Sequence, residues 1–247
     1  MNMEREATRT MRKTMVAAHT GCGIHPDNTM ASFREGIQIG ADIVEVDVRV
    51  THDGTPILLH DDSPYLHTHT YAQLNQPDIR SRLHPSYQTY EIATLEQVLR
   101  ESGPLELKLN LDLKSIASIE PTVQWVRKFH AQKRVYITGC SDHMTKRYPD
   151  MQVMLNTPDE LLPQQALHYA AFADSVCREA KEQGYAGLNM NGGTCRQQMV
   201  DKAHALGLKV WVYTINEPQR LDWFATMGVD AITTRKPGRL FEILRDC

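Results

Sequence analysis

Short apolar runs alternate with longer amphipathic segments along this chain of 247 residues. The runs are rich in branched aliphatic residues, which is typical of buried strands, and the segments between them carry apolar residues at helical spacing. The predicted strands span residues 15–19, 43–48, 105–114, 134–138, 151–156, 185–190, 208–214 and 230–234. Eight strands that alternate with helices predict an α/β fold, a (β/α)8 TIM barrel. Because barrels of this length commonly form one domain, we expect a single domain over residues 1–247.

One segment departs from this alternation, directly after the second predicted strand. The sequence RVTHDGTPILLHD contains Asp53-Gly54, a strong signal for a two-residue hairpin turn between apolar runs. Such a turn would place Asp47 directly opposite His60. The stretch that follows, residues 62–91, has no clean periodicity and is rich in His, Pro, Tyr and Gln. We therefore expect a hairpin extension after the second strand and a small insertion near residues 62–91, beside the barrel mouth.

Composition and charge limit what the protein can bind. The chain has 27 Lys and Arg residues against 30 Asp and Glu residues, a net charge of −3, which argues against binding to nucleic acid. Its five cysteines are scattered without a C-x-x-C pair, so they predict neither a disulfide framework nor a zinc knuckle. No apolar segment follows the polar N-terminus, and none is long enough to span a membrane. We expect a cytoplasmic protein that binds any anion through local charges.

Carboxylates gather on the strands of the first half of the predicted barrel. Glu45 and Asp47 lie one residue apart in the apolar run IVEVDV, so their side chains share one face of the strand. Asp112 and Lys114 repeat this spacing on the next barrel strand. Buried carboxylates need a cation, and oxygen ligands without cysteine favour Mg²⁺ or Ca²⁺ over Zn²⁺. We expect one divalent cation on Glu45, Asp47 and Asp112; the alternative is a structural ion-pair network with Lys114 and nearby arginines.

Two histidines fall at strand ends around the same mouth, where reacting groups lie in barrels of this kind. His19 ends the first predicted strand, and His60 ends the hairpin return. Histidine is the side chain that titrates near neutral pH, so the pair predicts general acid and base catalysis. Together with a cation and the ammonium group of Lys114, this set predicts cleavage of a phosphate ester. The sequence motifs of nucleotide-loop enzymes, dinucleotide enzymes and serine hydrolases are absent from the sequence.

An ordered series of short motifs resembles the glycerophosphodiester phosphodiesterase family. That family reads approximately H-R-G, P-E-N-T, E-x-D, a D-G turn, H-D and E-x-K. The matching segments here are His19-Thr20-Gly21, Pro26-Asp27-Asn28-Thr29, Glu45-Val46-Asp47, Asp53-Gly54, His60-Asp61 and Asp112-Leu113-Lys114. The C-terminal stretches KVWVYTINEP and GVDAITTRKP also look like the closing strands of the family, so the resemblance spans nearly the whole chain.

The resemblance implies a barrel hydrolase that cleaves glycerophosphodiesters to glycerol 3-phosphate and an alcohol. It implies one divalent cation and two catalytic histidines, one of which takes a proton from an attacking hydroxyl of the glycerol moiety while the other protonates the leaving alcohol. The matching positions are Glu45, Asp47 and Asp112 for the metal, His19 and His60 for acid and base, and Lys114 for substrate contact. By the same resemblance, Trp211 either lines the mouth or is a buried strand residue.

Three departures from the family pattern bear on activity. The largest is Thr20, which stands at the substrate-binding position where the family has an arginine that contacts the substrate phosphate. Asp27 and Asp112 each stand where the family has glutamate, and Thr233-Thr234 stands where T-D is common. These departures imply a divergent member of the family. It either hydrolyses a different phosphodiester or has weak activity, and in the second case it is a barrel that binds a phosphorylated polyol or lipid headgroup. The candidates to replace the missing arginine are Arg49, Arg80, Arg82 and Arg235.

Overall fold

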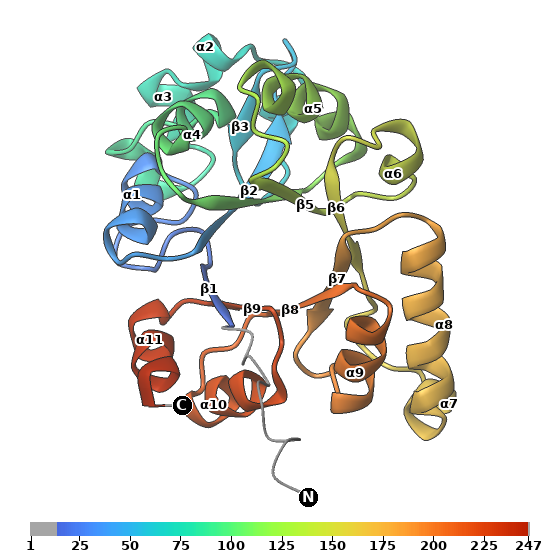
Figure 1. Cartoon of the computed structure of the whole chain (residues 1–247). Helices are drawn as coiled ribbons and strands as arrows, with labels where there is room; N and C mark the ends of the chain where they lie inside the picture. The colour runs from blue at the N-terminus through green and yellow to red at the C-terminus, as the bar shows by residue number, and fades with distance from the viewer. Residues whose placement is uncertain (1–13, 247) are drawn as a thin grey trace, which may run out of the picture.

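The computed structural model describes residues 14–246, and a closed barrel of parallel strands forms its centre (Figure 1). The barrel strands are β1 (Met15–Ala18), β2 (Ile43–Val50), β4 (Lys108–Leu113), β5 (Val135–Gly139), β6 (Gln152–Asn156), β7 (Gly187–Asn191), β8 (Lys209–Tyr213) and β9 (Ala231–Thr234). Strand β1 pairs in parallel with both β9 and β2, which closes the barrel. Each strand predicted from the sequence overlaps one of these eight, so the (β/α)8 TIM barrel is confirmed.

Helices surround the barrel on its outside (Figure 1). They are α1 (Met30–Gln38), α4 (Leu95–Ser102), η3 (Ile116–Ser118), α5 (Ile119–Lys128), α6 (Met144–Arg147), α7 (Pro163–Leu167), α8 (Tyr169–Glu182), α9 (Gln197–Ala205), α10 (Pro218–Met227) and α11 (Pro237–Asp246). Helix α1 begins at a capping box, in which the Thr29 side chain accepts from the Ser32 amide at 3.1 Å. In the described range 14–246, no helix is both long and apolar enough to cross a membrane.

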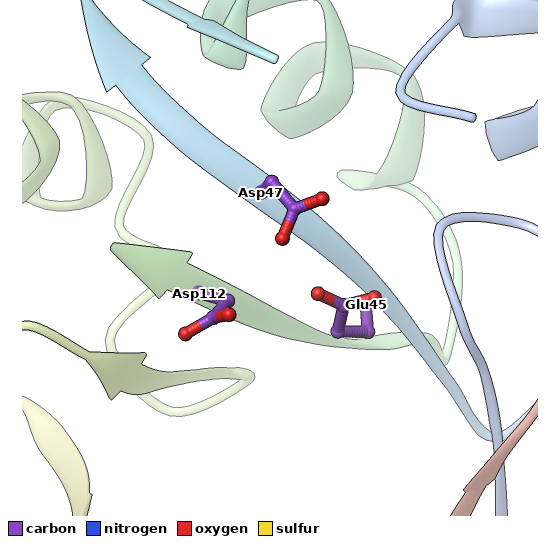
Figure 2. Close-up of side chains that lie close together, drawn as sticks. All are labelled: Glu45, Asp47 and Asp112. Atoms are coloured by element: carbon purple, nitrogen blue, oxygen red, sulfur yellow. The ribbon is translucent and has the colours of Figure 1, made fainter. Parts of the chain in front are cut away.

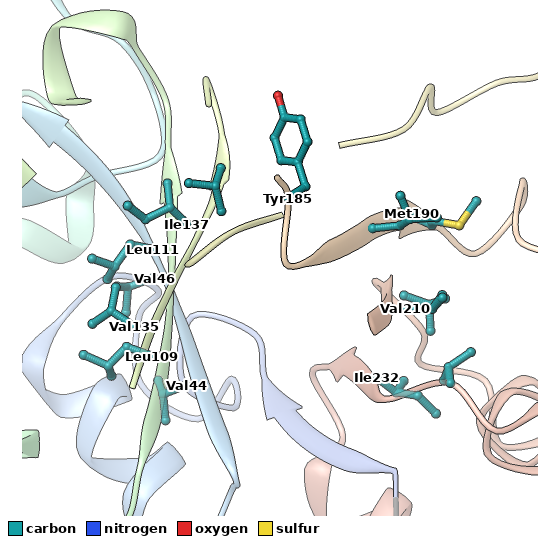
Figure 3. Close-up of a cluster of buried hydrophobic side chains, with 14 of the residues drawn as sticks. Val44, Val46, Leu109, Leu111, Val135, Ile137, Tyr185, Met190, Val210 and Ile232 are labelled. Atoms are coloured by element: carbon teal, nitrogen blue, oxygen red, sulfur yellow. The ribbon is translucent and has the colours of Figure 1, made fainter. Parts of the chain in front are cut away.

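The alternation of side chains along each strand separates two apolar layers. Val44 and Val46 of β2 belong to the large cluster between the strands and the helices, part of which is drawn in Figure 3. Ile43, on the other face of β2, packs inside the barrel with Tyr136 and Trp211. Glu45 and Asp47 follow Ile43 at intervals of two, so they share its inward face, closer to the C-terminal end of the strand. The predicted placement of both carboxylates on one face is confirmed.

The predicted hairpin forms, but its register differs from the prediction by one residue. Strand β3 (Pro56–Leu58) runs antiparallel to β2 with Val48 opposite Leu58, and Asp47 is therefore opposite Leu59 rather than His60. The loop has three residues, 52–54, between the facing residues Thr51 and Thr55, and it ends in Gly54 with φ 78°. A three-residue loop shifts the pairing by one position relative to a two-residue turn, which is why the predicted Asp47–His60 pairing is wrong.

The predicted insertion consists of short helical turns with a small apolar core of their own. These turns are η1 (Pro64–His67), α2 (Tyr71–Leu74), α3 (Pro77–Arg80) and η2 (Pro85–Gln88). Leu66, Leu74 and Tyr87 pack there with Ile57 of β3, so the insertion is fixed to the hairpin extension. It therefore stands beside the barrel mouth as expected.

Candidate active site

A cavity of about 690 Å³ opens where β1, β2 and β9 end, which is the side of a barrel that carries the reacting groups. Its walls include His19 and Thr20 after β1, Asp47 on β2 and His60 after β3. The insertion contributes further wall residues through its turn η2. The volume lies in the range of small-molecule sites. The two histidines predicted as acid and base thus face one cavity, and Asp47 faces it too, although Asp47 is not opposite His60 in the hairpin.

His19 is anchored to the closing strand of the barrel and is largely shielded from solvent. Its amide donates to the carbonyl of Thr234 at 3.0 Å. Its Nδ1 is buried and has no hydrogen-bond partner among residues 14–246. Burial, and next the positive charge of Arg235, lower the pKa of His19 below its ordinary value. A neutral imidazole that lines the cavity fits a group that accepts a proton during a reaction.

His60 lies beyond the end of β3 and is far more exposed, at 65% of its side chain. Its Nδ1 lies 2.8 Å from Oδ1 of Asp61, and its carbonyl accepts from Nε of Arg49 at 2.8 Å. Because a carboxylate can only accept, Nδ1 carries the proton of that contact. Asp61 therefore orients the ring and leaves Nε2 free for proton transfer.

Three carboxylates project from β2 and β4 toward one point inside the barrel (Figure 2). Glu45, Asp47 and Asp112 each offer an oxygen, and these oxygens all lie within 4.8 Å of one another. The parallel register pairs Asp47 with Asp112 directly. Burial, with Asp47 and Asp112 as the next causes, raises the pKa of Glu45 well above its usual range. Like charges at this spacing call for a cation.

Lys114 supplies part of that positive charge. Its Nζ lies 2.8 Å from Oδ1 of Asp47 and 2.5 Å from Oδ2 of Asp112. Burial opposes its charge, but Asp112 and Asp47 outweigh burial and raise the pKa of Lys114. Glu45 accepts instead from the amide of Thr20 at 2.9 Å. The ion-pair network and an oxygen-only donor set thus coexist, and the donor set fits a hard divalent cation such as Mg²⁺ or Ca²⁺.

Two backbone positions hold this acidic cluster in place. Thr20 has φ 45°, which is unusual for a β-branched residue, and this conformation directs its amide to Glu45. Gly139 has φ 78°, and a Cβ there would lie 2.3 Å from Oδ1 of Asp112. Thr138 donates to the same Asp112 oxygen at 3.2 Å. The end of β5 therefore approaches Asp112 so closely that only glycine fits.

Asn28 holds Asp47 in place, and the sequence pattern did not single it out as a site residue. Its Nδ2 donates to Oδ2 of Asp47 at 2.6 Å, and its Oδ1 accepts from the Asp47 amide at 3.0 Å. It reaches Asp47 from a left-handed backbone position with φ 59°, which asparagine tolerates better than most residues. The signal was its place in the Pro26-Asp27-Asn28-Thr29 segment.

Two of the residues expected to contact substrate lie away from the cavity walls. Trp211 is fully buried, with 0% exposure, and its ring lies 4.6 Å from that of Tyr136 inside the barrel. Of the two alternatives for Trp211, the structure therefore favours the buried strand residue over a residue that lines the mouth. The Lys114 side chain, paired with Asp47 and Asp112, is also outside the lining of the cavity, whereas Thr20 lines it.

The fold and this site together define a TIM-barrel enzyme with an acidic cluster and two histidines at the mouth. Residues 19–239 match the Glycerophosphoryl diester phosphodiesterase family, and the chain belongs to that family of phosphoric diester hydrolases. The predicted family and enzyme class are thereby confirmed.

Individual relatives agree over nearly the full chain. A glycerophosphodiester phosphodiesterase of Bacillus altitudinis is 26% identical over 249 residues, which cover 93% of this chain and 98% of the relative. The crystal structure of a glycerophosphodiester phosphodiesterase from Parabacteroides distasonis has a TM-score of 0.76 at 24% identity and covers 95% and 98% of the two chains. An Oleispira antarctica phosphodiesterase in complex with the product sn-glycerol-3-phosphate has a TM-score of 0.74 at 24% identity, covering 94% and 96%. The two structural likenesses support the barrel fold.

Proposed function

We propose that this protein is a metal-dependent hydrolase that cleaves glycerophosphodiesters to glycerol 3-phosphate and an alcohol. The observation that carries the proposal is that His19, His60 and Asp47, a member of the acidic cluster, line one cavity. The substrate class is supported by the family and by the product named for the Oleispira antarctica structure. The whole chain, residues 1–247, is proposed to act as one domain in the cytoplasm, and the four cysteines within the described range are free thiols, which fits that compartment.

Glu45, Asp47 and Asp112 would hold the single divalent cation, Mg²⁺ or Ca²⁺. Bound there, it would stabilise the negative charge that develops on the phosphoryl oxygens. Lys114 already neutralises part of the charge of Asp47 and Asp112, so it lowers the repulsion among the carboxylates.

The two histidines divide the proton transfers. His19, with its lowered pKa, is neutral near pH 7 and takes the proton of the attacking hydroxyl as the new P–O bond forms. His60 is in its imidazolium form in this step: Asp61 accepts from Nδ1–H, and the proton on Nε2 passes to the alcohol oxygen as the old P–O bond breaks. Because the attacking hydroxyl belongs to the glycerol moiety, this step leaves a cyclic phosphate and the free alcohol. Water then opens the ring: His60, now neutral, takes the proton of the water, and protonated His19 returns its proton to the glycerol oxygen, which gives glycerol 3-phosphate. Proton donors and acceptors of this kind each contribute roughly 10²- to 10⁴-fold to rate.

A catalytically weak barrel that binds a phosphorylated polyol is the second candidate. Thr20 favours it, because its side chain supplies a neutral hydroxyl at the position where the resembled family has a phosphate-binding arginine. Under this second candidate function, the barrel would bind glycerol 3-phosphate and release no product from a diester.

Release of glycerol 3-phosphate from a panel of glycerophosphodiesters separates the two candidates. The assay compares wild type, His19→Ala and His60→Ala with Mg²⁺, with Ca²⁺ and with a chelator. Turnover that requires metal and both histidines is expected. A folded, metal-loaded wild type that binds glycerol 3-phosphate but cleaves no diester would exclude the hydrolase and establish the binding protein.

A further inference from the structure

The cavity that contains the histidines is poor in positive charge. Among the described residues that line it, Arg235 is the only arginine or lysine, while Asp27, Asp47 and Asp61 add carboxylates. A phosphodiester is an anion, and the chain has a net charge of −3. Binding in this cavity therefore depends on a local cation that faces the substrate.

The backbone fixes Arg235 beside His19. It follows directly on β9, whose last residue, Thr234, accepts the His19 amide at 3.0 Å. The amide of Arg235 itself donates to Oδ1 of Asn216 at 2.9 Å. His19 and Arg235 both line the cavity.

Asp27 holds the guanidinium in a defined orientation. Its two carboxylate oxygens accept from Nη1 and Nη2 of Arg235 at 2.9 and 2.6 Å, a bidentate pair. A guanidinium has five N–H donors, so the remaining donors stay available to an anion. The side chain of Arg235 is 39% exposed, which keeps it accessible from the cavity.

The other candidate arginines are engaged elsewhere. Arg49 donates to the His60 carbonyl and lies 3.5 Å from Asp62. Arg80 donates to two backbone carbonyls of the insertion, and Arg82 donates to the carbonyl of Asp78. None of these three lines the cavity as the structure describes it.

We propose that Arg235, positioned by Asp27, is the residue that binds the substrate phosphate and that it takes over the task left open by Thr20. The inference rests on the proposed function, because it assumes that a phosphodiester enters this cavity. Arg235 approaches from the closing strand β9, next to β1, so a guanidinium reaches the same cavity from the neighbouring strand. The remaining N–H groups donate to non-bridging phosphate oxygens.

Binding of glycerol 3-phosphate, measured by titration calorimetry at saturating Mg²⁺ or Ca²⁺, tests this directly. We expect Arg235→Ala to weaken binding by about 10- to 100-fold, as for loss of charged hydrogen bonds, and to raise KM more than it lowers kcat. Arg235→Lys keeps the positive charge but not the planar guanidinium group, so it should lose less affinity for glycerol 3-phosphate than Arg235→Ala does. Arg239→Ala is the matched control, because Arg239 pairs with Glu242 within helix α11 and should bind as wild type does.

A double variant tests the role of Asp27. If Asp27 acts through Arg235, the single variant Asp27→Asn binds glycerol 3-phosphate more weakly than wild type does. The double variant Asp27→Asn, Arg235→Ala then binds it as weakly as Arg235→Ala alone. Additive losses would overturn the positioning role. Unchanged affinity in Arg235→Ala and Arg235→Lys, with a wild type that binds and turns over, would overturn the assignment of Arg235 alone. A wild type that neither binds glycerol 3-phosphate nor releases it would instead overturn the proposed function.

Discussion

Replacing Gly139 by alanine should damage the acidic cluster far more than the same replacement at Gly184. Both glycines have φ 78°, so a Cβ is equally unfavourable for the backbone at each position. At Gly184 the Cβ would meet nothing within 4 Å, whereas at Gly139 it would lie 2.3 Å from both Asp112 Oδ1 and the Leu113 carbonyl oxygen. The pair of variants therefore separates the backbone cost from the collisions with Asp112 and Leu113.

The expected magnitudes follow from these contacts. The left-handed backbone costs a non-glycine residue about 1 to 2 kcal/mol, and this should be the whole effect of Gly184→Ala on the free energy of unfolding. Overpacking adds about 1 to 3 kcal/mol, so Gly139→Ala should lose roughly 2 to 5 kcal/mol in total. The displaced Asp112 should also weaken Mg²⁺ or Ca²⁺ binding by about 10-fold or more.

Urea unfolding gives the free energies, and titration calorimetry on the folded variants gives the ion affinity. Gly184→Ala should bind the ion as wild type does. Equal losses of stability in the two variants would show that neither Asp112 nor the Leu113 backbone lies against Gly139. A stability loss in Gly139→Ala without a change in ion affinity would show that Asp112 is not a ligand.

Three further predictions concern the histidines and Asn28. His19→Ala and His60→Ala should each lower kcat by roughly 10²- to 10⁴-fold and leave calorimetric ion binding unchanged; a loss under 10-fold would exclude acid or base catalysis by that residue. Because the pKa of His19 is lowered, kcat/KM should stay constant down to below pH 6.5 and then fall as His19 is protonated. Arg235→Ala should move this fall to higher pH, and Asp27→Asn should move it to lower pH. Shifts of both variants in the same direction would contradict the charges assigned around His19. Asn28→Gly, which keeps the left-handed backbone relaxed, should weaken ion affinity by about 10- to 100-fold in calorimetry, and wild-type affinity would show that Asn28 does not support Asp47.

The fold could be predicted from the sequence because the barrel strands are short apolar runs that alternate with segments of helical spacing. The shared face of Glu45 and Asp47 followed from their spacing alone. The hairpin register could not be read, because Asp53-Gly54 is compatible with loops of two or three residues, and only the pairing of Thr51 with Thr55 decides between them.

The parts of the site that escaped sequence reasoning depend on contacts between distant segments. Asp27 and Arg235 lie 208 positions apart, and nothing local shows that the closed barrel brings them together. Asn28 supports Asp47 through a left-handed backbone position that no spacing pattern reveals. The depth of Trp211 inside the barrel likewise depends on the stagger of the strands, which periodicity does not report.

A crystal structure of the protein with glycerol 3-phosphate and Mg²⁺ or Ca²⁺ would show whether one mouth carries all of this chemistry. We expect the ion on Glu45, Asp47 and Asp112, and the phosphate within hydrogen-bonding distance of Arg235 and between His19 and His60. A phosphate bound outside this cavity, or an ion held by other residues, would contradict the proposed active site.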